Sequence, residues 1–74
     1  MKNIFIKIQS QRYRLATIKM YEPFENEHGF GIYVYFSIAN RSNRRYHLYV
    51  KKVDRDISLT KLDEFFNIKY YEKN

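Results

Sequence analysis

Tyrosines and basic side chains alternate with apolar residues in two segments, 30–39 and 44–53, and this pattern is the one best suited to chemistry. In both segments they fall on the face opposite to the apolar positions. The residues concerned are Tyr33, Tyr35, Arg45, His47, Tyr49 and Lys51. Base–aromatic stacking contributes about 1–3 kcal/mol per base, and cations beside the rings neutralise phosphates. The two segments therefore predict a binding face for nucleic acid or a partner protein. The alternative is plain surface, because tyrosine is also common on exposed strands for its β-propensity alone.

A second candidate is the basic stretch NRSNRR, in which Arg41, Arg44 and Arg45 lie within five residues. A two-stranded ribbon with basic residues fits into the major groove of DNA. Charged turns are also common as simply solvated surface. We expect this stretch to form an arginine-rich hairpin that contributes to binding.

Catalytic and metal chemistry have little support. His28 and His47 are the two histidines, and no spacing singles out an acid–base pair, although a small ribonuclease could use such residue types. Glu25, Glu27 and His28 are more typical of a solvated loop than of a metal site. The chain has no cysteine, which excludes disulfides and thiol catalysis. We expect a protein that is not an enzyme and that has no catalytic residue, metal or cofactor.

The alternation also predicts how the two segments pair. The apolar set of residues 30–39 and that of residues 44–53 both occupy even positions, so the numbers of paired residues must have an even sum. A three-residue loop at 41–43 satisfies this condition, with Asn43 in the left-handed conformation. The expected pairs are Phe36–Leu48 and Val34–Val50 on the buried face, and Tyr35–Tyr49, Ser37–His47 and Tyr33–Lys51 on the open face.

The remaining elements follow from local patterns. Ile4, Ile6 and Ile8 alternate as in a half-buried strand, and residues 13–21 read as a second strand followed by a loop at 22–29. Apolar residues at helical spacing predict a helix over 59–67 with Ser58 as its N-cap. Residues 68–74 fit either a short strand or an extended arm. Together these predict an α+β fold: a four-stranded antiparallel sheet (β-β-β-β-α) with one C-terminal helix packed on one face.

Residues 28–35, HGFGIYVY, resemble the octamer of RNA-recognition domains at four of its eight positions. The segment 4–7, IFIK, is similar to the companion motif of that family. Membership would imply that Phe30 and Ile32 face outward to bases. The alternation of residues 30–38 instead predicts that these side chains point into the core, and only about 12 residues carry the resemblance. The sequence is therefore not assigned to this family.

Length and charge limit the class of protein. Seventy-four residues predict a single domain over 1–74, with a net charge of +6. Such a charge favours nucleic acid, an acidic protein or a nucleoprotein as partner. A small core also leaves a homodimer open. No signal peptide or membrane span is visible, so we expect a cytoplasmic protein that does not bind membranes.

These observations lead to one functional prediction and one alternative. The prediction is a small basic nucleic-acid-binding protein. The sequence is rich in Phe, Ile, Tyr, Asn and Lys, which have A/T-rich codons, and this indicates a phage or mobile element as its source. The alternative is a small inhibitor or adaptor, of the anti-defence or anti-CRISPR kind, that binds a host protein or nucleoprotein enzyme without catalysis.

Overall fold

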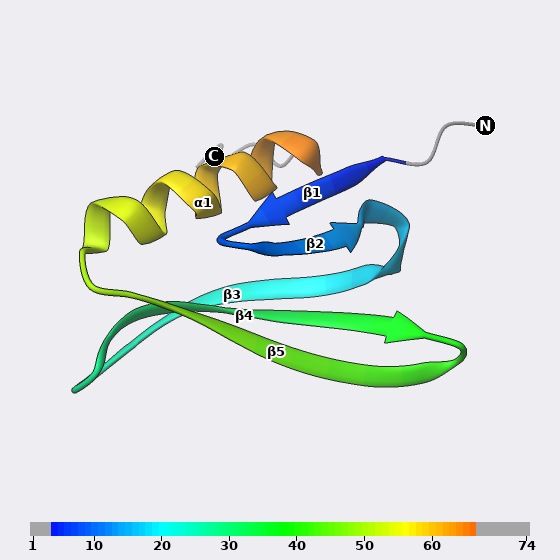
Figure 1. Cartoon of the computed structure of the whole chain (residues 1–74), viewed down its shortest axis with the longest axis horizontal. Helices are drawn as coiled ribbons and strands as arrows, with labels where there is room; N and C mark the ends of the chain where they lie inside the picture. Colours follow the sequence, from blue (N-terminus) through cyan, green and yellow to red (C-terminus); the bar gives the residue numbers. More distant parts are fainter. Residues whose placement is uncertain (1–3, 67–74) are drawn as a thin grey trace, which may run out of the picture.

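Residues 4–66, which the computed structural model describes, fold as two antiparallel sheets and one helix (Figure 1). In chain order the elements are β1 (Phe5–Ile8), β2 (Gln11–Arg14), the 3-10 turn η1 (Leu15–Thr17), β3 (Ile18–Asn26), β4 (Gly29–Ile38), β5 (Arg41–Tyr49) and α1 (Lys52–Phe65). β1 and β2 form one sheet, and β3, β4 and β5 form the other in that order. The α+β class with a C-terminal helix is confirmed. The single four-stranded sheet is wrong.

The second sheet arises because the segment 13–21, expected as one strand, is interrupted by η1. The Thr17 hydroxyl donates a hydrogen bond to the carbonyl of Arg14 at 2.7 Å. A hydroxyl that bonds nearby backbone offers the chain an alternative to strand pairing. β2 therefore ends at Arg14, and β3 begins at Ile18 as an edge of the other sheet.

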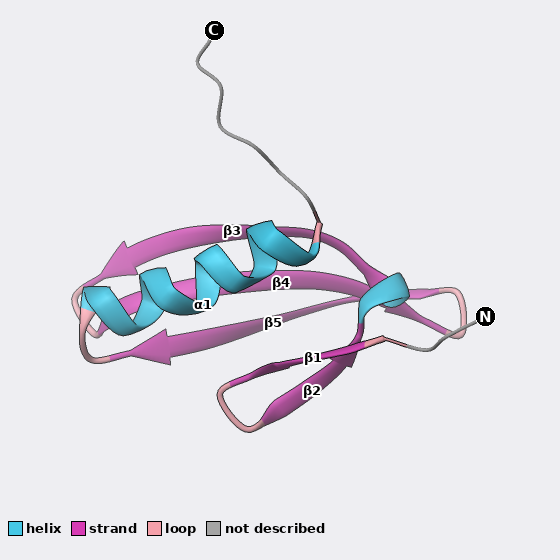
Figure 2. Cartoon of the chain, turned by 90° about the horizontal axis from the view of Figure 1, so that it is seen from above, coloured by secondary structure: helices cyan, strands magenta, loops and turns pink. Residues whose placement is uncertain are grey.

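The core lies between the three-stranded sheet and a layer formed by α1 and the β1–β2 hairpin (Figures 1 and 2). Buried apolar side chains come from both sheets and from the helix. They are Ile6, Ile8, Tyr13, Ile18, Ile32, Val34, Phe36 and Leu62. No described element covers the opposite face of the three-stranded sheet (Figure 1).

The turn between β4 and β5 lies at Ala39–Asn40 and not at residues 41–43. Ile38 pairs with Arg41, and the two residues between them have φ angles of 52° and 65°. Two consecutive positive φ values are typical of a type I′ turn, whose twist matches that of the flanking strands. This two-residue turn sets a different register along the whole hairpin.

The observed register reverses which side chains of β5 are buried. The pair Ile32–His47 has an odd sum of residue numbers, whereas the predicted pairs had even sums. A change from even to odd sums turns every side chain of β5 to the other face of the sheet. His47 is therefore buried, while Tyr46 and Leu48 are 64% and 37% exposed. The predicted pairs that this overturns are Phe36–Leu48, Val34–Val50, Tyr35–Tyr49, Ser37–His47 and Tyr33–Lys51.

The helix begins at Lys52, well before the expected start at residue 59. Asp54 lies in the first turn, where a carboxylate interacts favourably with the helix dipole. Ser58, expected as the N-cap, lies inside the helix. Among residues 4–66, no helix is long and apolar enough to cross a membrane. The expected strand or arm at 68–74 lies outside the described residues.

The early start of α1 is explained by Arg55, which is buried and points toward the three-stranded sheet. Its Nη1 donates hydrogen bonds to the carbonyl oxygens of Phe24 and Gly31, at 3.0 and 3.3 Å. Its Nε donates to Asp56 Oδ1 at 2.8 Å. The bonds to Phe24 and Gly31 tie the first turns of the helix to β3 and β4, and no local sequence pattern predicts them.

β3 runs through most of the segment 22–29, which was expected to be a loop, and ends at Asn26. Pro23 is tolerated in it because β3 pairs with β4 alone, and proline fits on an edge strand whose missing N–H faces outward. The Asn26 side chain accepts a hydrogen bond from the His28 backbone N–H at 2.8 Å. Gly29 follows with a φ of 142°, a conformation that favours glycine.

Candidate functional site

The uncovered face of the three-stranded sheet carries four aromatic side chains, which we call the ring face: Phe24, Tyr33, Tyr35 and Tyr46. The rings of Phe24 and Tyr33 stack with their centroids 4.3 Å apart. Tyr46 meets Phe24 edge-on at 6.5 Å, and Tyr35 lies 6.3 Å from Tyr33. All three strands of the sheet thus contribute to a continuous aromatic surface, and β4 contributes two of the rings.

Gly31 makes room for the Phe24 ring. The two residues pair across β3 and β4, and a Cβ at Gly31 would collide with that ring. The ring therefore lies over bare backbone, where it can reach Tyr33. The Arg55 guanidinium holds the carbonyl oxygens of both residues from the helix. The ring face is thus supported through the sheet by the helix.

Opposite charges lie on the ring face. The guanidinium carbon of Arg44 is 4.8 Å from the centroid of the Tyr33 ring, within the range of a cation–π contact. The Tyr35 hydroxyl donates a hydrogen bond to Glu22 Oε2 at 2.8 Å. This bond to a carboxylate, more than any other contact, raises the pKa of Tyr35 above its usual value. Tyr35 therefore stays a neutral donor that holds Glu22 in place.

Positive charge gathers at the β4–β5 turn end of the ring face. A shallow hollow of about 280 Å³ there is lined by Lys19, Tyr35 and Arg44, among others. Arg41 is exposed at the start of β5. Glu25 and Glu27 lie toward the β3–β4 turn, at the other end of the sheet. A polyanion would therefore meet attraction at one end of the face and repulsion at the other.

The predicted site residues divide between two faces and the helix. Tyr33, Tyr35 and Arg44 come together on the ring face, whereas Arg41 pairs with Ile38 and belongs to the opposite face of β5. Arg45, His47 and Tyr49 lie on the opposite face of β5, because the register is odd. Lys51 lies outside the sheet, as the N-cap residue of α1. The predicted grouping of these last four residues with Tyr33 and Tyr35 is therefore wrong.

His47 is a core residue and not part of an open face. Its Nε2 lies 2.6 Å from the Tyr13 hydroxyl, and its Nδ1 lies 3.0 Å from Gln9 Oε1. Gln9 Nε2 donates to the carbonyl of Leu48 at 2.7 Å, so Oε1 is the acceptor of this amide. His47 must then carry its proton on Nδ1 and accept from the Tyr13 hydroxyl through Nε2. Both ring nitrogens are thus occupied by structural hydrogen bonds.

Tyr49 has a similar structural role. Its hydroxyl donates a hydrogen bond to Ser58 Oγ at 2.8 Å and so joins β5 to α1. Burial, the strongest influence, raises the pKa of Tyr49 above its usual value. The side chain that was predicted to stack on a ligand instead fastens the helix to the sheet.

Sequence reasoning missed two members of the ring face. Phe24 was placed in a loop because Pro23 and several glutamates surround it. Tyr46 was placed in the core because it occupies an even position, as do the apolar residues Leu48 and Val50. The available signal was Gly31, since a glycine within a strand marks a site where another group approaches the backbone closely.

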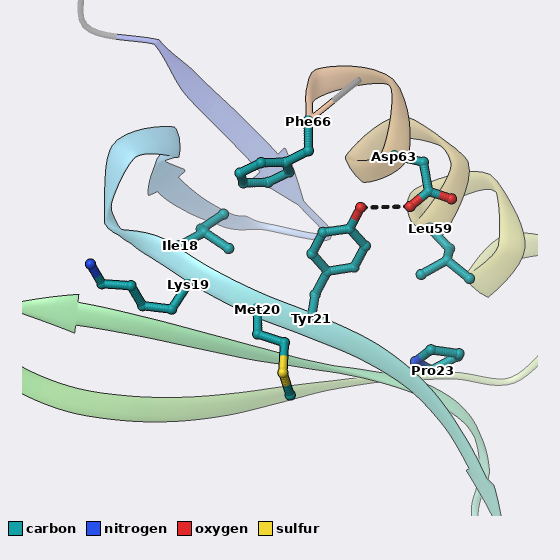
Figure 3. Close-up of a pocket in the computed structure, with 8 residues that line it drawn as sticks. All are labelled: Ile18, Lys19, Met20, Tyr21, Pro23, Leu59, Asp63 and Phe66. Carbon is teal, nitrogen blue, oxygen red and sulfur yellow. Dashed lines mark hydrogen bonds between the residues drawn. The ribbon is translucent and has the colours of Figure 1, made fainter. Parts of the chain in front are cut away.

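An apolar groove runs between β3 and α1 (Figure 3). The hollow measures about 350 Å³ and is lined by Ile18, Lys19, Met20, Tyr21, Pro23, Leu59, Asp63 and Phe66. The Tyr21 hydroxyl donates a hydrogen bond to Asp63 Oδ1 at 2.5 Å across it (Figure 3). This bond joins the edge strand to the helix within the groove.

Residues 4–66 contain no group of three or more His, Cys, Asp or Glu side chains placed to hold a metal ion. His28 Nε2 lies 3.5 Å from Glu27 Oε2, and both side chains are well exposed. Comparisons with protein-family models, curated proteins and solved structures found no match to this chain.

Proposed function

We propose that the ring face binds single-stranded nucleic acid. The observation that carries this proposal is the stacked and edge-on set of Phe24, Tyr33 and Tyr46 on an uncovered sheet, with the Arg44 guanidinium directly beside it. Aromatic platforms with adjoining cations bind unpaired bases with little regard to sequence. The net charge of +6 adds long-range attraction for a polyanion.

Tyr46 is the ring that we assign to the first stacked base. Its side chain is 64% exposed, whereas Phe24 and Tyr33 are half-buried and cover each other. A base on Tyr46 would continue the aromatic surface without displacing a ring. Arg44 lies two residues before Tyr46 on the same face of β5, and it supplies a cation for the phosphate of that nucleotide.

Glu22 sets the direction in which the strand would lie. Its carboxylate is fixed by Tyr35 near the middle of the face, and further acids follow toward the β3–β4 turn. Phosphates are repelled there and attracted at the end that holds Lys19 and Arg44. We infer that the backbone enters and leaves at the β4–β5 turn end. The proposed activity is binding without a catalytic step, since both nitrogens of His47 are engaged in the core.

The experiment measures binding of labelled single-stranded oligonucleotides by fluorescence anisotropy at fixed salt. Tyr46→Ala should weaken binding by about 1–3 kcal/mol, while Tyr46→Phe should bind like the parent because stacking needs the ring alone. Phe65→Ala is the matched control, since Phe65 is an aromatic residue on α1 that is 43% exposed. Equal affinities of Tyr46→Ala and the parent, or an equal loss in Phe65→Ala, would refute the proposal.

A second candidate function is an interface for a partner protein or another copy of the chain. It is favoured by Met20 and Leu48, which are 48% and 37% exposed and belong to the same face as the rings. Interfaces concentrate their binding energy in Tyr and Arg residues surrounded by apolar contacts. In that case Tyr46→Ala would dissociate a complex in sedimentation experiments and leave oligonucleotide affinity unchanged.

A further inference from the structure

A second groove lies on the other side of the sheet, between β2 and the turn end of the β4–β5 hairpin. It measures about 510 Å³, and we call it the arginine groove after Arg12, Arg14 and Arg45, which line it. Tyr13 and Phe36 contribute aromatic walls, and Thr17 lies at one end. Arg45 and Arg44 are consecutive on β5, so the groove and the ring face lie on opposite sides of the same strand.

The charges of the arginine groove have no acidic counterpart. No aspartate or glutamate is among the residues that line it. Within residues 4–66, the ion pairs are those of His28 with Glu27 and of Arg55 with Asp56, and neither involves the groove. Three arginines thus line this hollow, and no carboxylate lines it with them.

Aromatic rings hold two of the three arginines in place. The Arg45 guanidinium carbon lies 5.4 Å from the centroid of Phe36 and 5.9 Å from that of Tyr13. The guanidinium carbon of Arg14 lies 5.8 Å from the centroid of Phe5. A cation–π contact uses the flat face of a guanidinium and leaves its N–H donors at the edge for a ligand. Arg45 is therefore ordered at the groove before a ligand binds, whereas the guanidinium of Arg14 lies over Phe5, which is not part of the groove lining.

The charge of Arg45 changes the pKa values of two neighbouring groups. Burial raises the pKa of the Tyr13 hydroxyl, and the adjacent Arg45 opposes that rise. Burial lowers the pKa of His47, and the charge of Arg45 lowers it further. The effect of Arg45 on each group has the sign expected of a nearby positive charge.

We propose that the arginine groove binds phosphate groups of the nucleic-acid strand whose bases lie on the ring face. This inference rests on the proposed function for the identity of the ligand. Guanidinium groups match phosphate oxygens with paired hydrogen bonds, and several arginines along one hollow suit consecutive phosphates. A strand that leaves the ring face past Arg44 passes around the β4–β5 turn and reaches Arg45 on the other side.

The test replaces the two arginines of β2 together, as Arg12→Gln/Arg14→Gln, because both are exposed and lie on a strand outside the ring face. The matched control is Lys52→Gln/Lys61→Gln, which removes the same charge from exposed positions on α1. Thermal melts establish that each variant is folded. The probes are a single-stranded oligonucleotide and inorganic tripolyphosphate, which has no bases to stack.

For the oligonucleotide, the slope of log affinity against log salt concentration should fall by about 1.4 in the β2 variant, since each lost phosphate contact is worth about 0.7 on single strands. The control should change it far less. Tripolyphosphate should bind the parent and Tyr46→Ala alike and should lose most of its affinity in the β2 variant. The inference would be overturned if the β2 variant and the lysine control had the same salt dependence with the oligonucleotide or the same affinity for tripolyphosphate. It would also be overturned if the parent bound no tripolyphosphate.

The two proposals fail separately. If tripolyphosphate binds through Arg12 and Arg14 while the oligonucleotide does not bind the parent, the proposed function is refuted and the groove stands as a phosphate site. If the oligonucleotide binds through Tyr46 and its salt dependence is the same in the β2 variant and the control, the ring face stands and the groove is refuted.

Discussion

Acid should destabilise this protein through His47. The side chain is 4% exposed and sits between Tyr13 and Gln9, with Nδ1 as donor and Nε2 as acceptor. A second proton would have to enter at Nε2, where the Tyr13 hydroxyl already donates. Burial, and after it the charge of Arg45, lowers the pKa of His47 below its ordinary value. The folded protein therefore resists a proton that the unfolded chain accepts.

The direction of the effect follows from proton linkage. The unfolded chain binds a proton at this histidine near its ordinary pKa of about 6.5, and the folded chain binds it at lower pH. Above about pH 6.5 both states are neutral here, and the full stability is present. As pH falls from about 6.5 toward the folded pKa, the unfolded state binds more protons and the free energy of unfolding decreases, by at most about 1.4 kcal/mol per pH unit.

Tyr13→Phe tests the hydrogen bond that holds His47 in the core. It removes the hydroxyl that donates to Nε2 and leaves a buried acceptor without a partner, which should cost about 1–3 kcal/mol at neutral pH. Burial and the charge of Arg45, which lower the pKa of His47, both remain in this variant. Tyr13→Phe should therefore be less stable at neutral pH and should lose stability on acidification as the parent does.

The measurement combines urea denaturation between about pH 7.5 and pH 5 with an NMR titration of the histidine ring protons, a range that brackets the ordinary histidine pKa. His28→Gln is the control, because it removes the other histidine of the sequence, which is exposed. A His47 pKa at or above about 6.5, or an acid dependence that is lost in Tyr13→Phe, would refute the reasoning.

Two further predictions test the register and the core. Ala39→Gly should leave the protein as stable as the parent or raise the free energy of unfolding by up to about 1 kcal/mol, because φ at this turn residue is 52°. In the middle of a strand the same change would lower the free energy of unfolding by about 0.5–1 kcal/mol. Thermal denaturation therefore distinguishes the two registers. Leu62→Ala should cost about 2–5 kcal/mol because Leu62 is fully buried, whereas Leu48→Ala on the open face should cost less than about 1 kcal/mol. Urea denaturation of both variants checks this, and a larger loss at Leu48 would restore the register predicted from the alternation.

The strand that sequence predicted best is β4. Its apolar residues alternate without exception over Phe30–Ile38, and the buried side chains Ile32, Val34 and Phe36 follow that alternation. Tyr33 and Tyr35 were therefore placed on the correct face. The pattern is reliable here because β4 is the central strand, so its register is set by burial of one whole face.

The prediction failed at β5 because residue type alone does not show which polar groups find partners. Tyr46 and Leu48 are more apolar than His47, so the alternation favoured burying them. In the structure His47 is accommodated by Tyr13 and Gln9, which lie 34 and 38 residues away in the chain. A buried polar group is stable when its hydrogen bonds are satisfied, and such distant partners leave no local pattern.

Turn chemistry was the second source of error. Ser42 and Asn43 are good turn formers, whereas Ala39 is not a residue that favours a positive φ. The observed turn at Ala39–Asn40 is thus selected by the pairing of the strands on either side, and not by its own residues. A weak local preference was outweighed by the register that lets Ile32, Val34 and His47 share the core.

The reversal of β5 changes which surfaces the arginines belong to, and with it the chemistry that can be assigned to them. In the predicted register Arg45 faced outward with Tyr33 and Tyr35, and one side of the hairpin carried all the function. In the observed register Arg44 lies over Tyr33 on the ring face, while Arg45 lies against Phe36 in the arginine groove. Replacing Arg44 and Arg45 together would therefore alter two surfaces at once. Tyr46 on one side and the β2 arginines on the other allow each surface to be altered without the other.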